Sequence, residues 1–238
     1  MYILIGGEKG GSGKSTIAVN LAIEAALAGQ KVLLVDGDKQ GTASNWIGRR
    51  HQFVPDRPCP EVVQVPAAQF VPYLRQNGPK FDHVFIDVAG RDGEELRIAL
   101  GLVDVALFPV RPTINDLETA ANIEDLVSRF TVGKSHFEKA GFVLTHVSTN
   151  HAKRVADVAA AIEFLSTHQH VDVMKSVICW RTAYERAGLF GLSVTETLTG
   201  QVAKDASASM EVTRLFDELM SIGVKAKQKT GQREKVRA

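Results

Sequence analysis

Two lysines, Lys9 and Lys14, flank a short glycine-rich turn near the start of the chain. Small residues in such a turn let successive backbone N–H groups converge on an anion. Lys14 can then reach the β- and γ-phosphates of a nucleotide, and the hydroxyl of Ser15 can bind Mg²⁺. The residues expected at the nucleotide are Lys9, Gly10, Gly11, Ser12, Gly13, Lys14, Ser15 and Thr16. The spacing therefore predicts a loop that binds the phosphates of ATP.

Three aspartates extend this chemistry. Asp36 and Asp38 follow the apolar run 32–35, and Asp87 follows the apolar run 83–86. In an open parallel sheet, ligands bind at the carboxyl ends of the strands, so these side chains are expected beside the phosphate-binding loop. ATP hydrolysis needs Mg²⁺ at the phosphate oxygens and a group that orients the attacking water. Carboxylates serve both purposes, so the pattern predicts an Mg²⁺-dependent ATP hydrolase.

The hydrophobic pattern indicates the elements that position these residues. The loop follows an apolar run at 2–5 and precedes a segment with Ile17, Leu21 and Ala25 on one helical face. A helix that begins at the loop directs its positive end toward the phosphates. Strand-like runs alternate with helical segments along the chain, which predicts an α/β, doubly wound, mostly parallel sheet flanked by helices. The predicted strands are 2–6, 32–35, 61–65, 83–86, 104–110, 141–147 and 172–179.

Three later helices are predicted from their apolar spacing. The first spans 115–130 and opens with Asn115 and Glu118 in capping-box spacing. The last spans about 207–222 and is expected to stop at Gly223. The middle helix, 152–166, carries Val155, Val158, Ala159, Ile162 and Leu165 on one side.

The composition indicates one folded domain, 1–223, followed by a basic tail, 224–238. The tail has almost no apolar side chains and is expected to be disordered. The chain has 238 residues, 45% of them hydrophobic, and a formal net charge of +1, so bulk charge gives no argument for nucleic-acid binding. Neither a signal peptide nor a run of ~18 to 20 apolar residues is present, so we expect a cytoplasmic protein that does not bind membranes.

The loop resembles that of the ParA/MinD group of P-loop ATPases, in which the earlier lysine is the signature residue of a deviant Walker A motif. Glu8 stands where the ordinary motif has glycine. The resemblance implies that Lys9 reaches the phosphates bound by a partner copy, so that ATP produces a homodimer, and that Lys9 and Lys14 are both catalytic. A charge supplied by another subunit can also stabilise the transition state.

The same resemblance assigns roles to the aspartates. Asp36 and Asp87 would hold Mg²⁺ together with Ser15, and Asp38 would polarise the attacking water. The family usually reads D-x-D-P-Q at this segment, whereas this chain has Lys39 in place of the proline. That departure adds a cation near the phosphates and loosens the backbone.

Further segments resemble small plasmid-partition ParA proteins of the ParF type. They are Trp46, the turn 87–90, the run 108–113 and the segment 181–183. This resemblance implies a dimer that binds non-specific DNA at the nucleoid, and a small ParB-like centromere-binding protein that stimulates hydrolysis. Pro109 and Thr113 are then expected near the adenine, after a strand. The candidates for DNA contact are Lys153, Arg154, Lys175, Arg181, Arg186, Lys204, Arg214 and the basic residues of the tail.

Two alternatives remain open at this point. A metabolic enzyme of the dethiobiotin-synthetase type would use the same loop, with a cation such as Arg91 at its substrate. A ParA-like ATPase could also position an object other than DNA. The MinD-type membrane helix is not expected, because the tail lacks an apolar face.

Overall fold

A seven-stranded sheet occupies the centre of the molecule, with the strand order β3-β2-β4-β1-β5-β6-β7 and parallel pairing throughout. The computed structural model describes residues 1–88, 93–131 and 137–237, and the statements below concern those residues. The strands are β1 (Tyr2–Ile5), β2 (Val32–Asp36), β3 (Glu61–Gln64), β4 (His83–Asp87), β5 (Val105–Val110), β6 (Lys139–Val147) and β7 (Asp172–Cys179). All seven predicted strands are thus confirmed, and the fold class with them.

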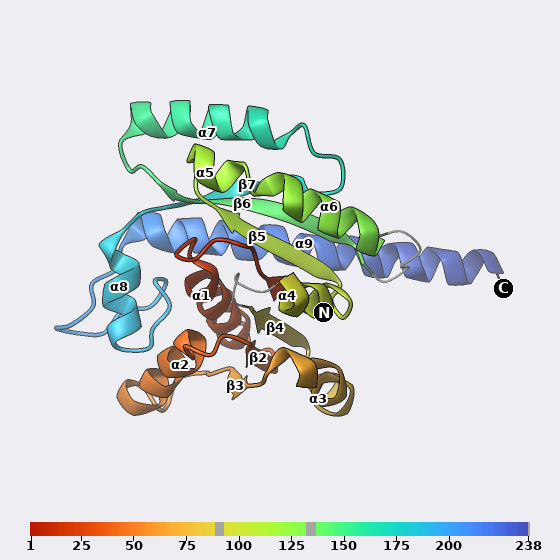
Figure 1. Ribbon diagram of the computed structural model, residues 1–238. Helices are drawn as coiled ribbons and strands as arrows, with labels where there is room; N and C mark the ends of the chain where they lie inside the picture. The colour runs from red at the N-terminus through yellow and green to blue at the C-terminus, as the bar shows by residue number, and fades with distance from the viewer. Residues whose placement is uncertain (89–92, 132–136, 238) are drawn as a thin grey trace.

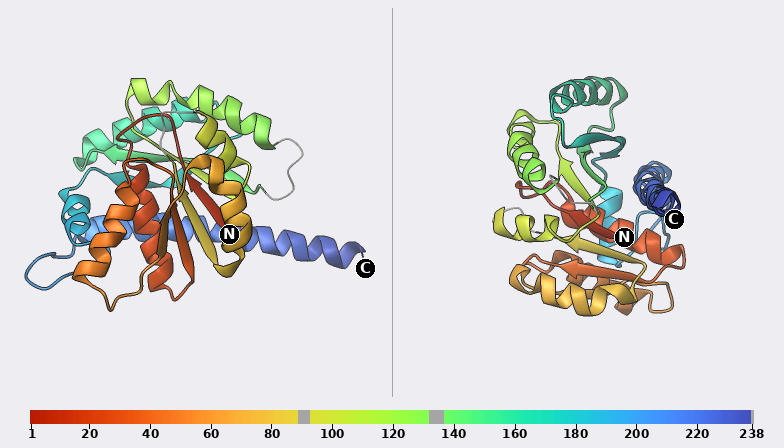
Figure 2. Two further views of the ribbon diagram at one scale, coloured as in Figure 1. Left: turned by 60° about the horizontal axis from the view of Figure 1, so that its bottom comes forward. Right: turned by 90° about the vertical axis from the view of Figure 1, so that its right-hand side faces the viewer.

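Helices cover both faces of this sheet (Figure 1). They are α1 (Lys14–Leu27), α2 (Thr42–Phe53), α3 (Phe70–Asn77), α4 (Gly93–Leu100), α5 (Ile114–Leu117), α6 (Ala120–Thr131), α7 (His151–Leu165), α8 (Thr182–Leu189) and α9 (Ala206–Arg237), with short 3₁₀ turns at Ala67–Gln69 and Gly78–Lys80. Figure 2 shows the sheet with α9 on one side and α3, α4 and α6 on the other. No helix among these described residues is long and apolar enough to cross a membrane.

Two apolar clusters fill the spaces above and below the sheet. Side chains of successive strand residues point to opposite faces, so Ile3 and Ile5 join the cluster beneath α1 and α9. Leu4 joins the other cluster, which contains the buried residues of α3, α4 and α6. Burial of both faces explains why the strands are almost continuously apolar in sequence.

The predicted helix over 115–130 is wrong as a single element. It is divided into α5 and α6, and the N-terminal capping position of α5 is Thr113 rather than Asn115. The Asp116 carboxylate accepts bonds from the Arg111 guanidinium, and the Thr119 hydroxyl donates to the Asp116 carbonyl oxygen at 2.6 Å. Side chains that bond locally in this way compete with the helical backbone pattern, which accounts for the interruption.

The end of the last helix also differs from the prediction. α9 begins at Ala206 and continues through Gly223 to Arg237, so the predicted end of the helix at Gly223 is wrong. One glycine inside a helix costs only about 1 kcal/mol, and the lysines, glutamines and arginines after it are good helix formers. A shortage of apolar side chains therefore does not by itself end a helix.

The predicted apolar side of α7 is only partly covered. Leu165 is fully buried, whereas Val155 is 55% exposed and Ile162 is 41% exposed. Val158 is half-buried, and Ala159 is exposed. The helix forms as predicted, and part of its apolar side is in contact with solvent.

Candidate functional site

The glycine-rich loop joins β1 to α1 at the carboxyl edge of the sheet. Gly11 and Gly13 have φ angles of 72° and 87°, a region that side chains with a Cβ rarely adopt. The Gly13 carbonyl accepts the first backbone bond of α1, from the Ile17 N–H at 2.9 Å. The buried Thr145 hydroxyl of β6 donates to the Ser12 carbonyl oxygen at 2.9 Å. The loop is therefore fixed to the sheet at the place where α1 begins.

The two lysines of the loop have different surroundings. Lys14 is buried, with 9% of its surface exposed, and its ammonium donates to the Lys9 carbonyl oxygen at 2.6 Å. Desolvation lowers the pKa of Lys14, and the charges of Asp87, Asp38 and Asp116 oppose that shift. The Lys9 side chain is exposed. One lysine thus points inward among carboxylates, and the other lies at the surface.

Asp36 and Asp87 are paired residues of the neighbouring strands β2 and β4. The Asp36 carboxylate is fully buried and accepts from the backbone N–H groups of Asp38, at 3.1 Å, and Ser44, at 2.8 Å. Asp87 is also buried, and desolvation raises its pKa to about 7, while a bond from Ser15 lowers it and the charge of Asp36 raises it further. Negative charge is therefore concentrated between the loop and these two strands.

Asp87 and Ser15 fit a divalent cation. The Oδ2 atom of Asp87 is buried without a hydrogen-bond partner among the described residues, and Ser15 interacts with the same carboxyl group. No group of three or more His, Cys, Asp or Glu side chains in the described ranges could hold a metal ion alone. Mg²⁺, however, is usually held by one or two carboxylates, water and the phosphates of the substrate. Asp87, Ser15 and, behind them, Asp36 match that donor set.

Asp38 lies in a turn next to the same carboxylates. Its Oδ1 atom accepts from the Gln40 N–H at 2.9 Å, and its carbonyl oxygen accepts from the Gln64 amide at 2.9 Å. The side chain is half-buried and close enough to Lys14 to influence its pKa. Lys39, which replaces the expected proline, is exposed. Asp38 therefore lies beside the loop, as predicted, and can face a ligand there.

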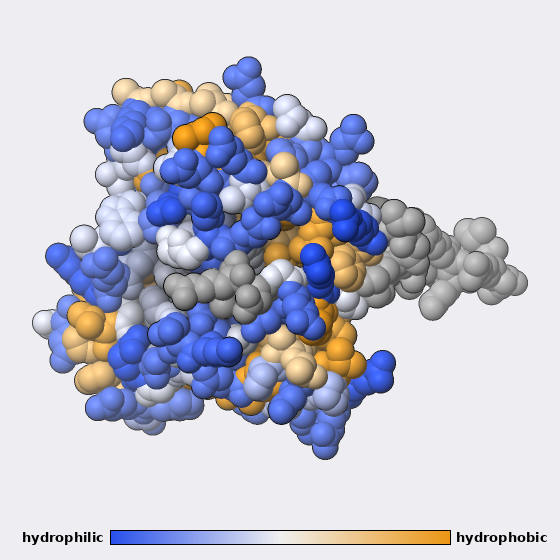
Figure 3. Space-filling model, in the orientation of Figure 1, coloured by the Kyte–Doolittle hydropathy of each residue, from blue (hydrophilic) through white to orange (hydrophobic). Residues whose placement is uncertain are grey.

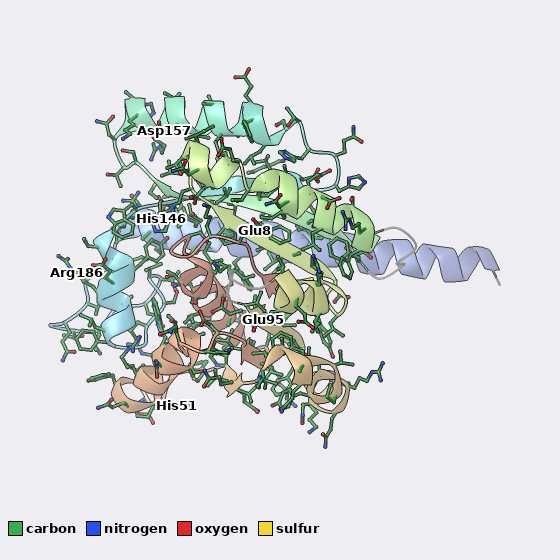
Figure 4. The ribbon with its side chains drawn as sticks, viewed as in Figure 1. Glu8, His51, Glu95, His146, Asp157 and Arg186 are labelled. Atoms are coloured by element: carbon green, nitrogen blue, oxygen red, sulfur yellow. The ribbon has the colours of Figure 1, made fainter. Side chains whose placement is uncertain are left out.

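A pocket of about 400 Å³ adjoins the loop on the side of β6 and β7. Gly11, Gly13 and Thr16 line one wall, and His146 and Trp180 stack against each other with ring centroids 4.9 Å apart. The pocket's other lining residues are Ile17, Trp46, Thr145, Ile178, Cys179, Arg181, Tyr184 and Glu185. Figure 4 shows His146 and Glu8 near the loop that precedes α1. The pocket has the size and lining expected for a nucleoside.

Two buried polar atoms in this pocket have no partner among the described residues. They are Nδ1 of His146 and the hydroxyl of Tyr184. Desolvation lowers the pKa of His146, and the charge of Arg111 acts in the same direction, so the neutral imidazole is favoured. Buried polar groups usually have a hydrogen-bond partner, and a base or ribose in the pocket would supply one.

His146, Trp180 and Tyr184 are not among the residues predicted for the site, because only acidic residues at strand ends are used in that prediction. His146 and Trp180 lie at the carboxyl ends of β6 and β7. Extending the strand-end rule to aromatic residues would have found both.

Pro109 and Thr113 do not line this pocket. Pro109 lies inside β5, so the prediction that it follows the strand is wrong. Proline is tolerated there because β1 pairs with β5 only as far as Leu107, so no backbone partner on that side is lost. Thr113 is exposed at the start of α5. Arg91 and the turn residues 89–90 lie outside the described residues.

Comparisons with known proteins show the family to which this chain belongs. The family described as the CobQ/CobB/MinD/ParA nucleotide binding domain matches residues 3–194. Maintenance of carboxysome distribution protein A from Gloeobacter kilaueensis is 30% identical over 215 residues, which cover 89% of this chain and 90% of that protein. Protein ParA from Rhizobium radiobacter is 24% identical over 191 residues, which cover 79% of this chain and 82% of that protein.

Solved structures share the fold. Cell division ATPase MinD of Pyrococcus furiosus superposes with a TM-score of 0.69 and 20% identity, over 92% of this chain and 98% of that one. The ATP complex of Cyanothece McdA gives a TM-score of 0.68 and 15% identity, over 92% and 95% of the two chains. The chain therefore belongs to the CobQ/CobB/MinD/ParA nucleotide-binding family and is an ATPase of the ParA/MinD type.

Proposed function

We propose that this chain is a ParA-type ATPase that segregates a plasmid or another replicon. Two copies would pair when both hold ATP, bind non-specific DNA at the nucleoid, and separate after hydrolysis. The observation that carries this proposal is the contrast between the two lysines. Lys14 is buried and bonded inside the loop, whereas Lys9 is exposed on the same loop.

The contrast supports pairing through the nucleotide. Lys14 can compensate the phosphates held by its own loop, since its ammonium lies among the carboxylates of that site. The exposed Lys9 side chain is free to extend toward the phosphates of a facing copy. A cation supplied in this way both joins the subunits and stabilises charge that develops during phosphoryl transfer. Triphosphate binding would then control assembly.

The remaining residues have complementary roles in hydrolysis. Asp87 and Ser15 would hold Mg²⁺, with Asp36 orienting the backbone at Asp38 and Ser44. When bound, Mg²⁺ neutralises charge on the β- and γ-phosphate oxygens. The Asp38 carboxylate would accept a hydrogen bond from the attacking water and so orient it. The His146–Trp180 side of the pocket would hold the base, which places the nucleoside away from Pro109 and Thr113.

The basic segment 224–238 would contact DNA phosphates, because Glu234 is its single acidic residue among many cations. The partner that stimulates hydrolysis would be a small ParB-like protein bound to the centromere of the cargo. We treat 1–223 as the ATPase unit and 224–238 as its DNA-binding extension.

A second candidate function is the positioning of a cargo other than DNA. The similarity to a carboxysome distribution protein extends over 90% of that protein, so it is not confined to the phosphate-binding motifs. Such an ATPase would use the same ATP-dependent pairing but a different cargo adaptor.

DNA binding by the purified full chain tests the proposal. Anisotropy of labelled duplex DNA is measured with ATP, with ADP and without nucleotide, each at two salt concentrations, and sedimentation follows assembly in parallel. ATP-restricted DNA binding that weakens with salt supports the partition function. ATP-dependent pairing without DNA binding supports the positioning of another cargo. A chain that stays monomeric with ATP and does not bind DNA would support a metabolic enzyme of the dethiobiotin-synthetase type.

A further inference from the structure

A groove of about 650 Å³ runs along one edge of the sheet, between α7 and α9. Its floor is β7, the last strand in the sheet order. Figures 1 and 2 show α7 and α9 on opposite sides of this edge. An exposed sheet edge is a common place for another polypeptide to bind.

The carboxylates in the groove are already engaged. Glu218 of α9 accepts from the backbone N–H groups of Lys175, at 2.8 Å, and Ser176, at 2.9 Å, and from the Ser176 hydroxyl at 2.7 Å. Glu211, about two helical turns earlier, accepts from the Cys179 N–H and from Arg181. These bonds occupy the N–H groups of Lys175, Ser176 and Cys179, so this part of the edge is less suited to backbone pairing with an added strand.

The cations in the groove are available. Arg154, Lys175 and Arg214 line it, and none of the three forms a salt bridge within the described part of the chain. Lys175 and Arg214 are exposed, and Arg154 is half-buried. The three cations outnumber the two carboxylates of the groove, and Glu211 is already paired with Arg181, so the net charge that the groove presents to a partner is positive.

The groove also contains apolar side chains in contact with water. Val155, at 55% exposure, and Val158 belong to the side of α7 that lacks a covering element. Val177 of β7 lies between them and α9. Figure 3 shows apolar residues gathered over α7. A partner that covers these valines would gain the favourable free energy of removing apolar surface from water.

We propose that this groove binds an acidic, partly apolar peptide segment of a partner protein. Acidic side chains would pair with Arg154, Lys175 and Arg214, and apolar side chains would cover the valines. DNA fits less well, because a phosphate backbone would leave the valines in contact with water. The binding surface is separate from the phosphate-binding loop, so the proposal does not depend on the function proposed for that loop.

The test uses the full chain and three fluorescein-labelled probes. One is a short peptide in which glutamates alternate with valines, the second has lysines in place of the glutamates, and the third is duplex DNA. In anisotropy titrations the acidic peptide should bind, and the lysine peptide should not. The double variant Lys175→Glu and Arg214→Glu should weaken binding of the acidic peptide by about tenfold or more, since two attractions become repulsions.

Matched variants keep the result interpretable. Arg75→Glu with Lys80→Glu makes the same change in charge at exposed positions near the opposite edge of the sheet, and it should leave peptide binding unchanged. Val155→Asp places a carboxylate in the groove at an exposed position and should weaken binding of the acidic peptide without altering the thermal midpoint. Failure of the acidic peptide to bind, or equal weakening by both double variants, overturns the proposal. Loss of DNA binding alone in the groove variant assigns the surface to DNA instead.

Discussion

The ammonium of Lys14 donates a hydrogen bond to the backbone carbonyl oxygen of Lys9 at 2.6 Å. The Ser12 hydroxyl donates to the same oxygen at 3.3 Å. Two donors within the loop therefore fix the backbone of Lys9, although its side chain is exposed. Lys14, which we assign to the chain's own nucleotide, therefore also fixes the backbone of Lys9, which we assign to the nucleotide of a facing copy.

Lys9→Ala should separate nucleotide binding from pairing. The truncated side chain leaves the Lys9 carbonyl and its bond to Lys14 in place, so a fluorescent ATP analogue should bind the variant nearly as well as the wild type. ATP-dependent pairing, followed by sedimentation velocity, should weaken by at least about tenfold, because a charge-assisted contact to phosphate is lost. Lys14→Ala is the matched control and should lose nucleotide binding itself. Undiminished pairing by Lys9→Ala would remove Lys9 from the interface.

Asp38→Ala should bind ATP and pair but turn over slowly. A group that orients or deprotonates the attacking water typically contributes about 10²- to 10⁴-fold to the rate, so phosphate release should fall by about that range. Asp38→Asn keeps an oxygen that can accept from the Gln40 N–H, and it therefore preserves the turn. Comparable loss of turnover in both variants assigns the effect to the carboxylate charge, whereas full activity of Asp38→Asn would assign it to the turn.

The raised pKa of Asp87 predicts that the stability of the nucleotide-free protein depends on pH. Its pKa is raised from 3.8 to about 7, mainly by desolvation, so the folded state favours the protonated carboxyl. The stabilisation from the neutral form is complete below the unfolded pKa and is lost as the pH rises through about 7. The asparagine side chain in Asp87→Asn cannot ionise. The free energy of unfolding of this variant minus that of the wild type should therefore increase from about pH 4 to pH 7 and then level off.

Urea unfolding in EDTA across that range measures the difference. The slope for one proton cannot exceed about 1.4 kcal/mol per pH unit. A constant difference between the two proteins would show that Asp87 does not titrate in this window.

Substitution of the buried Arg50 should strongly destabilise the fold at a site away from the phosphate-binding loop. Its side chain is fully buried and bonds to Glu196, whose side chain is 7% exposed, at 2.7 Å. Arg50→Met would leave a buried carboxylate without this partner, and the free energy of unfolding should fall by about 3 to 5 kcal/mol. The control is Arg129→Met, which breaks the exposed pair with Asp125 and should cost less than about 1 kcal/mol. Similar losses of unfolding free energy in the two variants would show that burial of the ion pair does not determine its contribution to stability.

Removal of 225–238 should reduce DNA affinity. Fewer phosphate contacts release fewer counterions, so the slope of log affinity against log salt should also become shallower. ATP-dependent pairing of the shortened chain should persist, since Lys9 and Lys14 remain. Sedimentation velocity measures that pairing. Identical salt curves for the full and shortened chains would place the DNA contacts elsewhere.

Most of the fold follows from patterns that are local in sequence. The apolar run 83–86 predicts β4 because a strand that is covered on both faces needs apolar residues on both sides. The loop could also be predicted, since Gly13 and Lys14 are adjacent to the helix that they begin. Asp36 and Asp87, which each follow an apolar run, are paired residues of neighbouring strands.

Other features depend on contacts between distant segments. His146 and Trp180 come from different strands, so neither residue alone indicates a stacked pair beside the loop. The interruption before α6 arises from the bond between Arg111 and Asp116, which helical periodicity does not contain. The sequence pattern likewise does not predict that Val155 is exposed. An apolar stripe on a helix does not show whether another element of the same chain covers it.

The two glutamates that cap β7 also limit how copies of this chain can associate. Unsatisfied strand edges are the usual route by which β-containing proteins join into aggregates or continuous intermolecular sheets. Glu211 and Glu218 close that route at Lys175, Ser176 and Cys179 with side chains from the same molecule. Crowding on a DNA or cargo surface therefore need not cause irreversible aggregation through these positions.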